Sequence, residues 1–301
     1  MLKGEGIWIW QLPQSAGGSV KRLVTDAVRM KFDHVLIKCC DGKSKYMIND
    51  HGDNRAVAAL RAAGIQVAGW GYHYGGDPDA EAKIAVAMCR ELSHDVYVLN
   101  AEREFETAAG GEKILRFIQT FRAQGGVNIS LGLSTFSLPS LHGGFPYAKA
   151  LVGAGACEFV LPQVYTVPSR RKPSLRTALT YLEEARRELA QFGKPVIPTL
   201  RAYRGDGLED EEYIADDAIA FLEKAPTLGL PAWNWWNWPS GEGIPRLWAA
   251  LAQYPNVAPG CSTPSLPLGS IRLEMSKPAA VATAATLEML ATALRRANGG
   301  S

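Results

Sequence analysis

Short apolar runs recur along the chain at intervals of roughly 30–35 residues, and each is rich in β-branched and aromatic side chains. Such runs are typical of strands that are buried on both faces of a parallel sheet. The runs are GIWIWQL from residue 6, HVLIKCC from 34, QVAGWGY from 66, DVYVLNA from 95, NISLGLS from 128, EFVLPQV from 158, PVIPTLR from 195 and LPAWNWW from 230.

The segments between these runs place apolar residues at the spacing of amphipathic helices, as Val20, Leu23 and Ala27 do. Strands that alternate with helices in this way predict an α/β protein, a single (β/α)8 TIM barrel. A doubly wound open sheet is the alternative, but no glycine-rich dinucleotide fingerprint follows the first strand. Helices are expected over residues 19–31, 54–63, from 77 onward, and over 110–123, 146–153, 173–192, 210–224 and 244–253.

The composition changes after the last predicted helix. Residues 1–254 are assigned to the barrel, and residues 255–277 begin with a stretch rich in Pro, Ser and Gly that reads as a linker. Residues 278–301 are rich in alanine and carry leucines at helical spacing, so they are expected to form a C-terminal helix or tail. This segment is expected to be a helix docked on the barrel, a helix that assembles with a partner, or a frayed tail.

Composition and charge exclude several classes of protein. Of 301 residues, 47% are hydrophobic and 21% charged, which excludes wholesale disorder. The net charge of +2 gives no reason to expect a nucleic-acid partner. The sequence has no apolar stretch long enough for a membrane span and no secretory signal before the first strand. We expect synthesis in the cytoplasm, followed by retention there or by release through lysis or a phage-associated route.

The cysteines and histidines do not form a metal-binding pattern. Five cysteines occur without metal-type spacing and are expected to be free, buried thiols in a reducing compartment: Cys39, Cys40, Cys89, Cys157 and Cys261. Only His73 lies at a strand end, and no His-x-His pair exists. We therefore expect neither a metal nor another cofactor.

The fourth apolar run ends in a carboxylate where this fold carries its chemistry, at the C-terminal ends of the strands. In VYVLNAERE, alternation puts Val98, Asn100 and Glu102 on one face. Partial desolvation at the rim of an apolar strand raises the pKa of a carboxylic acid and suits it to general-acid catalysis. Glu102 is therefore the candidate general acid. A surface glutamate just past the strand is the alternative.

Aromatic and polar side chains also follow the other strands. Aromatic rings at the rim would make platforms for sugar rings, whereas outward-facing ones would fill the core. His73 is either a site residue or a hydrogen-bonded core residue. The candidates for substrate binding are Trp10, Lys38, Tyr72, His73, Tyr74, Gln163, Tyr165, Arg201, Tyr203, Trp235 and Asn237.

Lys38 interrupts an otherwise apolar strand, and a buried lysine needs a partner. Glu102 and Asp41 are the candidate partners. A Schiff-base lysine, with lyase or aldolase chemistry, is a further hypothesis.

Strands two to four resemble those of the glycoside hydrolase family 25 muramidases. HVLIKCCDG, GWGYHYGGDPDAEA and VYVLNAERE look like that family's apolar strand with Lys, its Tyr-His-aromatic strand end and its Asp-x-Glu motif. PQVYT is similar to the aromatic end of strand six in that superfamily. The whole barrel also resembles bacterial and phage proteins described as glycoside-hydrolase-like barrels. The resemblance implies a TIM barrel with glycosidase activity.

Two positions depart from the family pattern. GIWIWQL lacks the acidic residue that the family carries on strand one, and Asn100 stands in place of the Asp. Retaining and inverting hydrolysis both use two carboxylates. Either the 2-acetamido group of the substrate is the nucleophile and Asn100 orients it, which resembles some endo-N-acetylglucosaminidases, or a loop carboxylate completes the site. The loop candidates are Asp41, Glu104 and Asp206.

The sequence thus favours a glycoside hydrolase that acts on an N-acetylated glycan, with peptidoglycan as the expected substrate. Glu102, Asn100, Glu104 and Asp41 are its candidate catalytic residues. The alternative is a catalytically degenerate barrel that binds glycan or has a structural role. The oligomeric state stays open.

Overall fold

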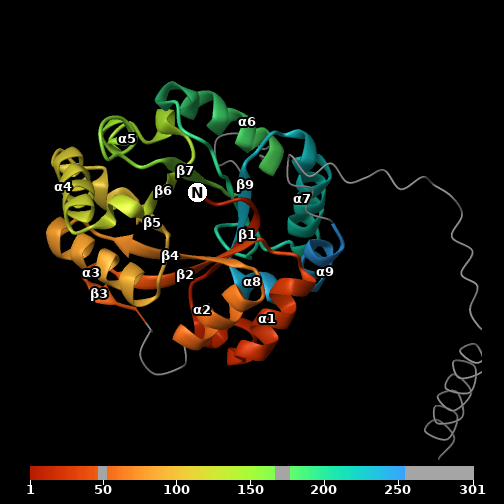
Figure 1. Cartoon of the computed structure of the whole chain (residues 1–301). Helices are drawn as coiled ribbons and strands as arrows, with labels where there is room; N and C mark the ends of the chain where they lie inside the picture. The colour runs from red at the N-terminus through yellow and green to blue at the C-terminus, as the bar shows by residue number, and fades with distance from the viewer. Residues whose placement is uncertain (47–52, 167–176, 255–301) are drawn as a thin grey trace, which may run out of the picture. The chain divides into compact units, whose positions relative to one another are not determined.

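A closed ring of parallel strands surrounded by helices forms the body of the protein (Figure 1). The computed structural model describes residues 1–46, 53–166 and 177–254. Strand β1 (Gly4–Ile9) pairs in parallel with both β2 (His34–Asp41) and β9 (Ala232–Trp236), and this double pairing closes the ring. The (β/α)8 barrel predicted from the sequence is confirmed. The predicted linker and C-terminal helix lie outside the described residues.

The remaining barrel strands follow the order of the chain, and each pairs with its sequence neighbours. They are β4 (Gln66–His73), β5 (Val96–Ala101), β6 (Ser130–Phe136), β7 (Phe159–Val164) and β8 (Thr199–Arg201). A short strand that was not predicted, β3 (Ser44–Lys45), pairs antiparallel with the end of β2.

Strand β8 is shorter than its apolar run suggests. The run begins at Pro195, but the strand begins only at Thr199, after Pro198. Proline has no N–H to donate to a neighbouring strand, so the two prolines reduce the pairing before Thr199 to a single bridge between Val196 and Val160. The pairing of β8 with its neighbours is therefore confined to Thr199–Arg201.

The predicted helices are present with small shifts at their ends. They are α1 (Val20–Arg29), α2 (Asp53–Ala62), α3 (Pro78–Glu91), α4 (Gly110–Ala123), α5 (Tyr147–Leu151), α6 (Ala178–Leu189), α7 (Glu211–Lys224) and α9 (Pro245–Gln253). One short helix, α8 (Trp238–Glu242), was not predicted. Residues 173–176, predicted to begin the sixth helix, lie outside the described residues.

Two apolar layers follow from the alternation of side chains along each strand. On β5, Tyr97 and Leu99 belong to the larger layer between the barrel and its helices. Val96 and Val98 belong to the smaller layer inside the barrel. The inner layer fills the interior of the barrel below its C-terminal end.

Three tryptophans form the top of the inner layer. The ring centroids of Trp8 and Trp70 are 5.1 Å apart. The ring centroid of Trp236 lies 5.5 Å from that of Trp8 and 5.4 Å from that of Trp70. All three pairs meet edge to face, an arrangement that the ring quadrupole favours. The indole N–H of Trp70 donates to the carbonyl oxygen of Ile9 at 3.2 Å. This tryptophan cluster gives the mouth of the barrel a rigid apolar floor.

Two further expectations concern the described residues. The four cysteines among them are buried and free, as predicted, and burial raises the pKa of the Cys157 thiol to about 12. Cys261 lies outside the described residues. None of the described helices combines the length and the apolar character that crossing a bilayer would require.

The inner layer should contribute strongly to stability. Leu36 is fully buried in it, so Leu36→Ala should lower the free energy of unfolding by about 2–5 kcal/mol through lost burial and a residual cavity. Leu141, 55% exposed, is the control, and Leu141→Ala should change that free energy by less than about 0.5 kcal/mol. Denaturant titration of both variants measures the difference. Equal effects would contradict a packed barrel interior.

Candidate active site

A cavity of about 330 Å³ lies among the C-terminal ends of the barrel strands. This is the end of a (β/α)8 barrel where ligands bind. Strands β1, β5, β6, β7 and β9 contribute to its lining, together with the loops after β5, β7 and β8. The lining residues are Trp8, Asn100, Glu102, Ser134, Gln163, Tyr165, Tyr203, Asp206 and Trp236. The cavity therefore brings together residues that lie far apart in the sequence.

Glu102 is held through one of its two carboxyl oxygens. The side-chain amides of Gln163 and Asn100 donate hydrogen bonds to Oε1 at 2.8 Å and 3.3 Å. Desolvation raises the pKa of the Glu102 carboxyl above its usual value, and the two amide donors only partly oppose this effect. No described residue donates a hydrogen bond to Oε2. The carboxyl group is thus fixed in orientation, holds its proton to higher pH than an exposed glutamate, and keeps one oxygen available.

Asn100 presents an unpaired acceptor in the same cavity. The residue is only 5% exposed, and Oδ1 has no hydrogen-bond partner among the described residues. A buried carbonyl oxygen without a partner costs free energy. Because the amide nitrogen of Asn100 already donates to Glu102, the direction of Oδ1 is fixed. A ligand that offers an N–H or O–H donor beside Glu102 would satisfy it.

The loop after β8 adds a second carboxylate to the cavity. Asp206 accepts a hydrogen bond from the Tyr203 hydroxyl at 2.5 Å, and its Oδ2 lies 3.7 Å from the Arg201 guanidinium. The ring of Tyr203 meets that of Tyr165 edge to face, with centroids 5.4 Å apart. Asp206 is one of the three loop carboxylates that the sequence offered, and it is the one that lines the cavity with Glu102.

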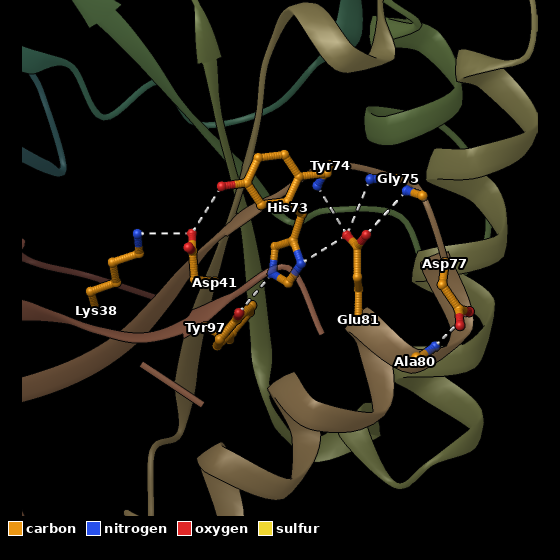
Figure 2. Close-up of polar contacts among 10 residues, drawn as sticks. Lys38, Asp41, His73, Tyr74, Gly75, Asp77, Ala80, Glu81 and Tyr97 are labelled. Atoms are coloured by element: carbon orange, nitrogen blue, oxygen red, sulfur yellow. Dashed lines mark hydrogen bonds and ion pairs between the residues drawn. The ribbon is translucent and has the colours of Figure 1, made fainter. Parts of the chain in front are cut away.

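The remaining predicted carboxylates lie on the β2–β4 side of the barrel mouth. Figure 2 shows Asp41 between the Lys38 ammonium, at 3.0 Å, and the Tyr74 hydroxyl, at 3.3 Å. Asp41 is therefore the partner of Lys38, as one of the two alternatives predicted. Glu104 accepts a hydrogen bond from the Tyr72 hydroxyl at 2.8 Å.

The cavity lining does not include the exposed Trp10, nor the four side chains Asp41, Glu104, Tyr72 and Tyr74. Nor does it include Lys38, whose ammonium lies over the rings of Tyr46 and Trp70. Among the described residues, no group of three or more histidine, cysteine or acidic side chains could hold a metal ion.

The prediction that His73 binds substrate is wrong. His73 is fully buried, its Nδ1 lies 3.2 Å from Glu81 Oε2, and its Nε2 lies 2.8 Å from the Tyr97 hydroxyl (Figure 2). It alternates with the inward-facing Tyr72 on β4 and so points toward the helices. Desolvation lowers the pKa of its imidazole. Of the two alternatives for His73, a site residue or a hydrogen-bonded core residue, the structure shows the core residue.

Two residues at the end of the last strand, Trp235 within it and Asn237 just after it, were also predicted wrongly. Trp235 points outward, is buried among the helices and donates its indole N–H to Glu5 at 2.5 Å. Desolvation raises the pKa of Glu5 to about 8. Asn237 is buried and caps α8, where its side-chain oxygen accepts from the backbone N–H of Ser240 at 3.4 Å. The inward position at this strand end belongs to Trp236.

Arg201 lies behind the cavity rather than in its lining. Its Nη1 donates to the carbonyl oxygens of Tyr203 and Gly205 at 3.2 Å and 3.0 Å, and its guanidinium stacks 4.1 Å from the ring centre of Tyr203. The direct substrate contact predicted for Arg201 is therefore not what the structure shows. The residue supports the loop that carries Asp206.

Trp8, Ser134 and Trp236 line the cavity but were not among the predicted substrate-binding residues. Trp236 could have been found from the pattern of the last strand. Asn234 is the polar residue of an otherwise apolar strand and marks the face on which a polar site would lie. Alternation along the strand puts Trp236, and not Trp235, on that same face.

Comparison with known proteins identifies the fold class. No protein-family model and no curated protein matches the sequence. The spore cortex-lytic enzyme SleL of Bacillus cereus matches with a TM-score of 0.60 and 8% identity, covering 83% of this chain and 73% of SleL. An endo-1,4-β-mannanase of Rhizomucor miehei has a TM-score of 0.58 and 12% identity over 78% of this chain and 86% of its own.

A domain of a thermostable chitinase from Pyrococcus furiosus has a TM-score of 0.54 and 13% identity over 79% of this chain and 84% of its own. The protein therefore has a glycoside-hydrolase-like TIM-barrel fold. The resemblance to family 25 stays a prediction, because identities this low show the fold alone.

The hydrogen bond from Gln163 should control the titration of Glu102. The Gln163 amide donates to Glu102 at 2.8 Å, and this hydrogen bond favours the ionised carboxylate. Gln163→Leu removes the donor, so the pKa of Glu102 should rise further. Titration of the Glu102 carboxyl carbon by ¹³C NMR measures this shift. Gln119→Leu on the exposed face of α4 is the control and should leave the titration unchanged. A lowered pKa in Gln163→Leu would contradict the proposed balance of forces.

Proposed function

We propose that the protein is a glycoside hydrolase that acts on an N-acetylated glycan, with peptidoglycan as the first substrate to test and Glu102 as the general acid. The observation that carries this proposal is the state of Glu102. Its carboxyl group is desolvated and raised in pKa, it is oriented through Oε1 by two amide donors, and it lines a cavity at the barrel mouth.

Each feature of Glu102 has a use in glycoside hydrolysis. A raised pKa keeps the carboxylic acid protonated at the pH at which an exposed glutamate has lost its proton. The proton can pass from Oε2 to the glycosidic oxygen as the bond from that oxygen to the anomeric carbon breaks. The amides of Gln163 and Asn100 then stabilise the carboxylate that forms, because hydrogen bonds to Oε1 favour its charged state.

Asn100 supports an N-acetylated sugar as the substrate. Its unpaired Oδ1 is an acceptor next to the proposed acid, and the N–H of a 2-acetamido group is a donor next to the anomeric carbon. The rings of Tyr165, Tyr203 and Trp236 give the rest of the lining an aromatic character suited to sugar faces.

The comparisons support a fold that glycoside hydrolases use. The structures with similar barrels include a spore cortex-lytic enzyme, a chitinase and a mannanase. The chitinase structure was determined with chito-oligosaccharides, and the unpaired acceptor of Asn100 is our reason to propose an N-acetylated glycan rather than a mannan.

Glu102→Gln keeps the shape of the side chain and removes the acidic proton. We expect kcat on peptidoglycan or a chitin oligosaccharide to fall by about 10²–10⁴-fold, with the dissociation constant changed by no more than a few-fold. Glu106→Gln is the matched control, because Glu106 lies in the same loop, pairs with His142 and is not part of the cavity lining. Reducing-end release and calorimetric titration measure the two quantities.

Two outcomes would contradict this assignment. Wild-type protein that binds these glycans but never cleaves them would favour the degenerate, glycan-binding barrel. Undiminished hydrolysis by Glu102→Gln would place the acid elsewhere.

Recognition of the acetamido group can be tested without turnover. In the Glu102→Gln background, an N-acetylated chitin oligosaccharide should bind more tightly than its de-N-acetylated counterpart, and adding Asn100→Ala should reduce that ratio by about 5–30-fold, the equivalent of one buried hydrogen bond. Ser140→Ala, on the exposed loop after β6, serves as a control. An unchanged ratio would show that Asn100 does not contact the acetamido group.

A further inference from the structure

Asp206 lies on a tight turn that the sequence Gly205-Asp206-Gly207-Leu208 encodes. Gly205 and Leu208 exchange both backbone hydrogen bonds at 3.0 Å, so the loop between them has two residues. Both have positive φ, 52° for Asp206 and 83° for Gly207. This is the geometry of a type I′ turn, for which Asp-Gly is a preferred pair. Aspartate is one of the few residues other than glycine that adopt this left-handed conformation readily, so the sequence specifies the turn.

Side chains from the barrel hold this turn in place. Arg201, only 4% exposed, donates through Nη1 to the carbonyl oxygens of Tyr203 and Gly205, which tie the start of the turn to strand β8. The Tyr203 hydroxyl donates to Oδ2 of Asp206, and Arg201 lies nearest to the same oxygen. One oxygen of Asp206 is thus fixed, and no described residue donates to the other.

Asp206 and Glu102 form a matched pair across one cavity. Each carboxyl group is oriented through one oxygen, that of Glu102 by the amides of Gln163 and Asn100 and that of Asp206 by the Tyr203 hydroxyl. In each group, the other oxygen has no donor among the described residues. Their strands, β5 and β8, are separated in the barrel by β6 and β7, so the two groups approach the cavity from different walls. The side chain of Asp206 is 65% exposed, which gives water direct access to it.

We infer that Asp206 is the second catalytic carboxylate and acts as the general base that activates the attacking water. This inference rests on the proposed glycosidase function. Asp41, another loop candidate, is bonded to Lys38 and Tyr74 and does not line the cavity. Glu104 lies near enough to Glu102 to help raise its pKa, but both of its oxygens are engaged, by Tyr72 and by Arg103, and it is not a lining residue.

The reaction then proceeds in one displacement. A water molecule gives a proton to Oδ1 of Asp206 while its oxygen forms a bond to the anomeric carbon. The bond between that carbon and the glycosidic oxygen breaks, its electron pair stays on the oxygen, and the proton of Glu102 passes to it. Exchange with solvent returns both carboxyl groups to their starting states. Because water attacks the face opposite the leaving group, the anomeric configuration is inverted.

Asp206→Asn tests this role with little effect on the fold. Asn-Gly suits a type I′ turn as well as Asp-Gly does, so the variant keeps the loop and loses only the base. We expect kcat on chitotetraose to fall by about 10²–10⁴-fold, with the dissociation constant within a few-fold of the wild type. Glu209→Gln, an exposed carboxylate three residues further along, is the control and should retain wild-type kcat.

Two further readouts separate a base from a merely structural residue. In wild-type digests, ¹H NMR of the first product should show the anomer opposite to that of the cleaved bond. Azide needs no base, so adding it to Asp206→Asn should restore cleavage and give a glycosyl azide of inverted configuration.

The outcomes distinguish this inference from the proposed function. Retention of configuration by an active wild type would overturn the role of Asp206 and favour attack by the 2-acetamido group. Wild-type kcat in Asp206→Asn would also overturn it, and both results would leave the glycosidase intact. A wild-type protein that cleaves no N-acetylated glycan would overturn the proposed function and this inference with it.

Discussion

Alternation of side chains along closed parallel strands is the constraint on which the site depends. In a barrel each residue faces either the interior or the surrounding helices, and its neighbour faces the other way. Trp236 therefore lines the cavity and Trp235 packs under the helices, although the two are adjacent. On β5, the same rule turns Asn100 inward and carries Glu102 to the rim. Among the strand residues, only those on the inward side can take part in the chemistry at the mouth, and the loops after β5, β7 and β8 add Glu102, Tyr165 and Asp206.

Two opposing effects act on the central carboxyl group. Desolvation at the barrel mouth disfavours the charged form of Glu102, and the amides of Gln163 and Asn100 favour it. Desolvation is the larger effect, so the pKa is raised, but the amides still fix the orientation of the group. A wholly apolar surrounding would leave the carboxylate that forms after proton transfer without stabilisation. Trp8 and Trp236 of the tryptophan cluster line the same cavity as Glu102.

Much of the fold could be predicted because its signals are local. The predicted helix over 110–123 coincides with α4, since its apolar stripe, its preceding turn and its end are all visible in the sequence. The errors concern the direction of side chains at strand ends. His73 and Trp235 were assigned to the site by their position along the strand, but only tertiary pairing reveals which face a strand turns inward. Asn237 was taken for a site residue because helix α8, which it caps, had not been predicted.

The roles of Glu102 and Asn100 are tested most directly by the crystal structure of Glu102→Gln bound to chitotetraose. We expect a glycosidic oxygen within about 3 Å of the position of Glu102 Oε2 and a hydrogen bond from the adjacent acetamido N–H to Asn100 Oδ1. Oligosaccharide bound only along the β2–β4 side, around Trp10 and Tyr74, with the cavity empty of sugar, would contradict these roles.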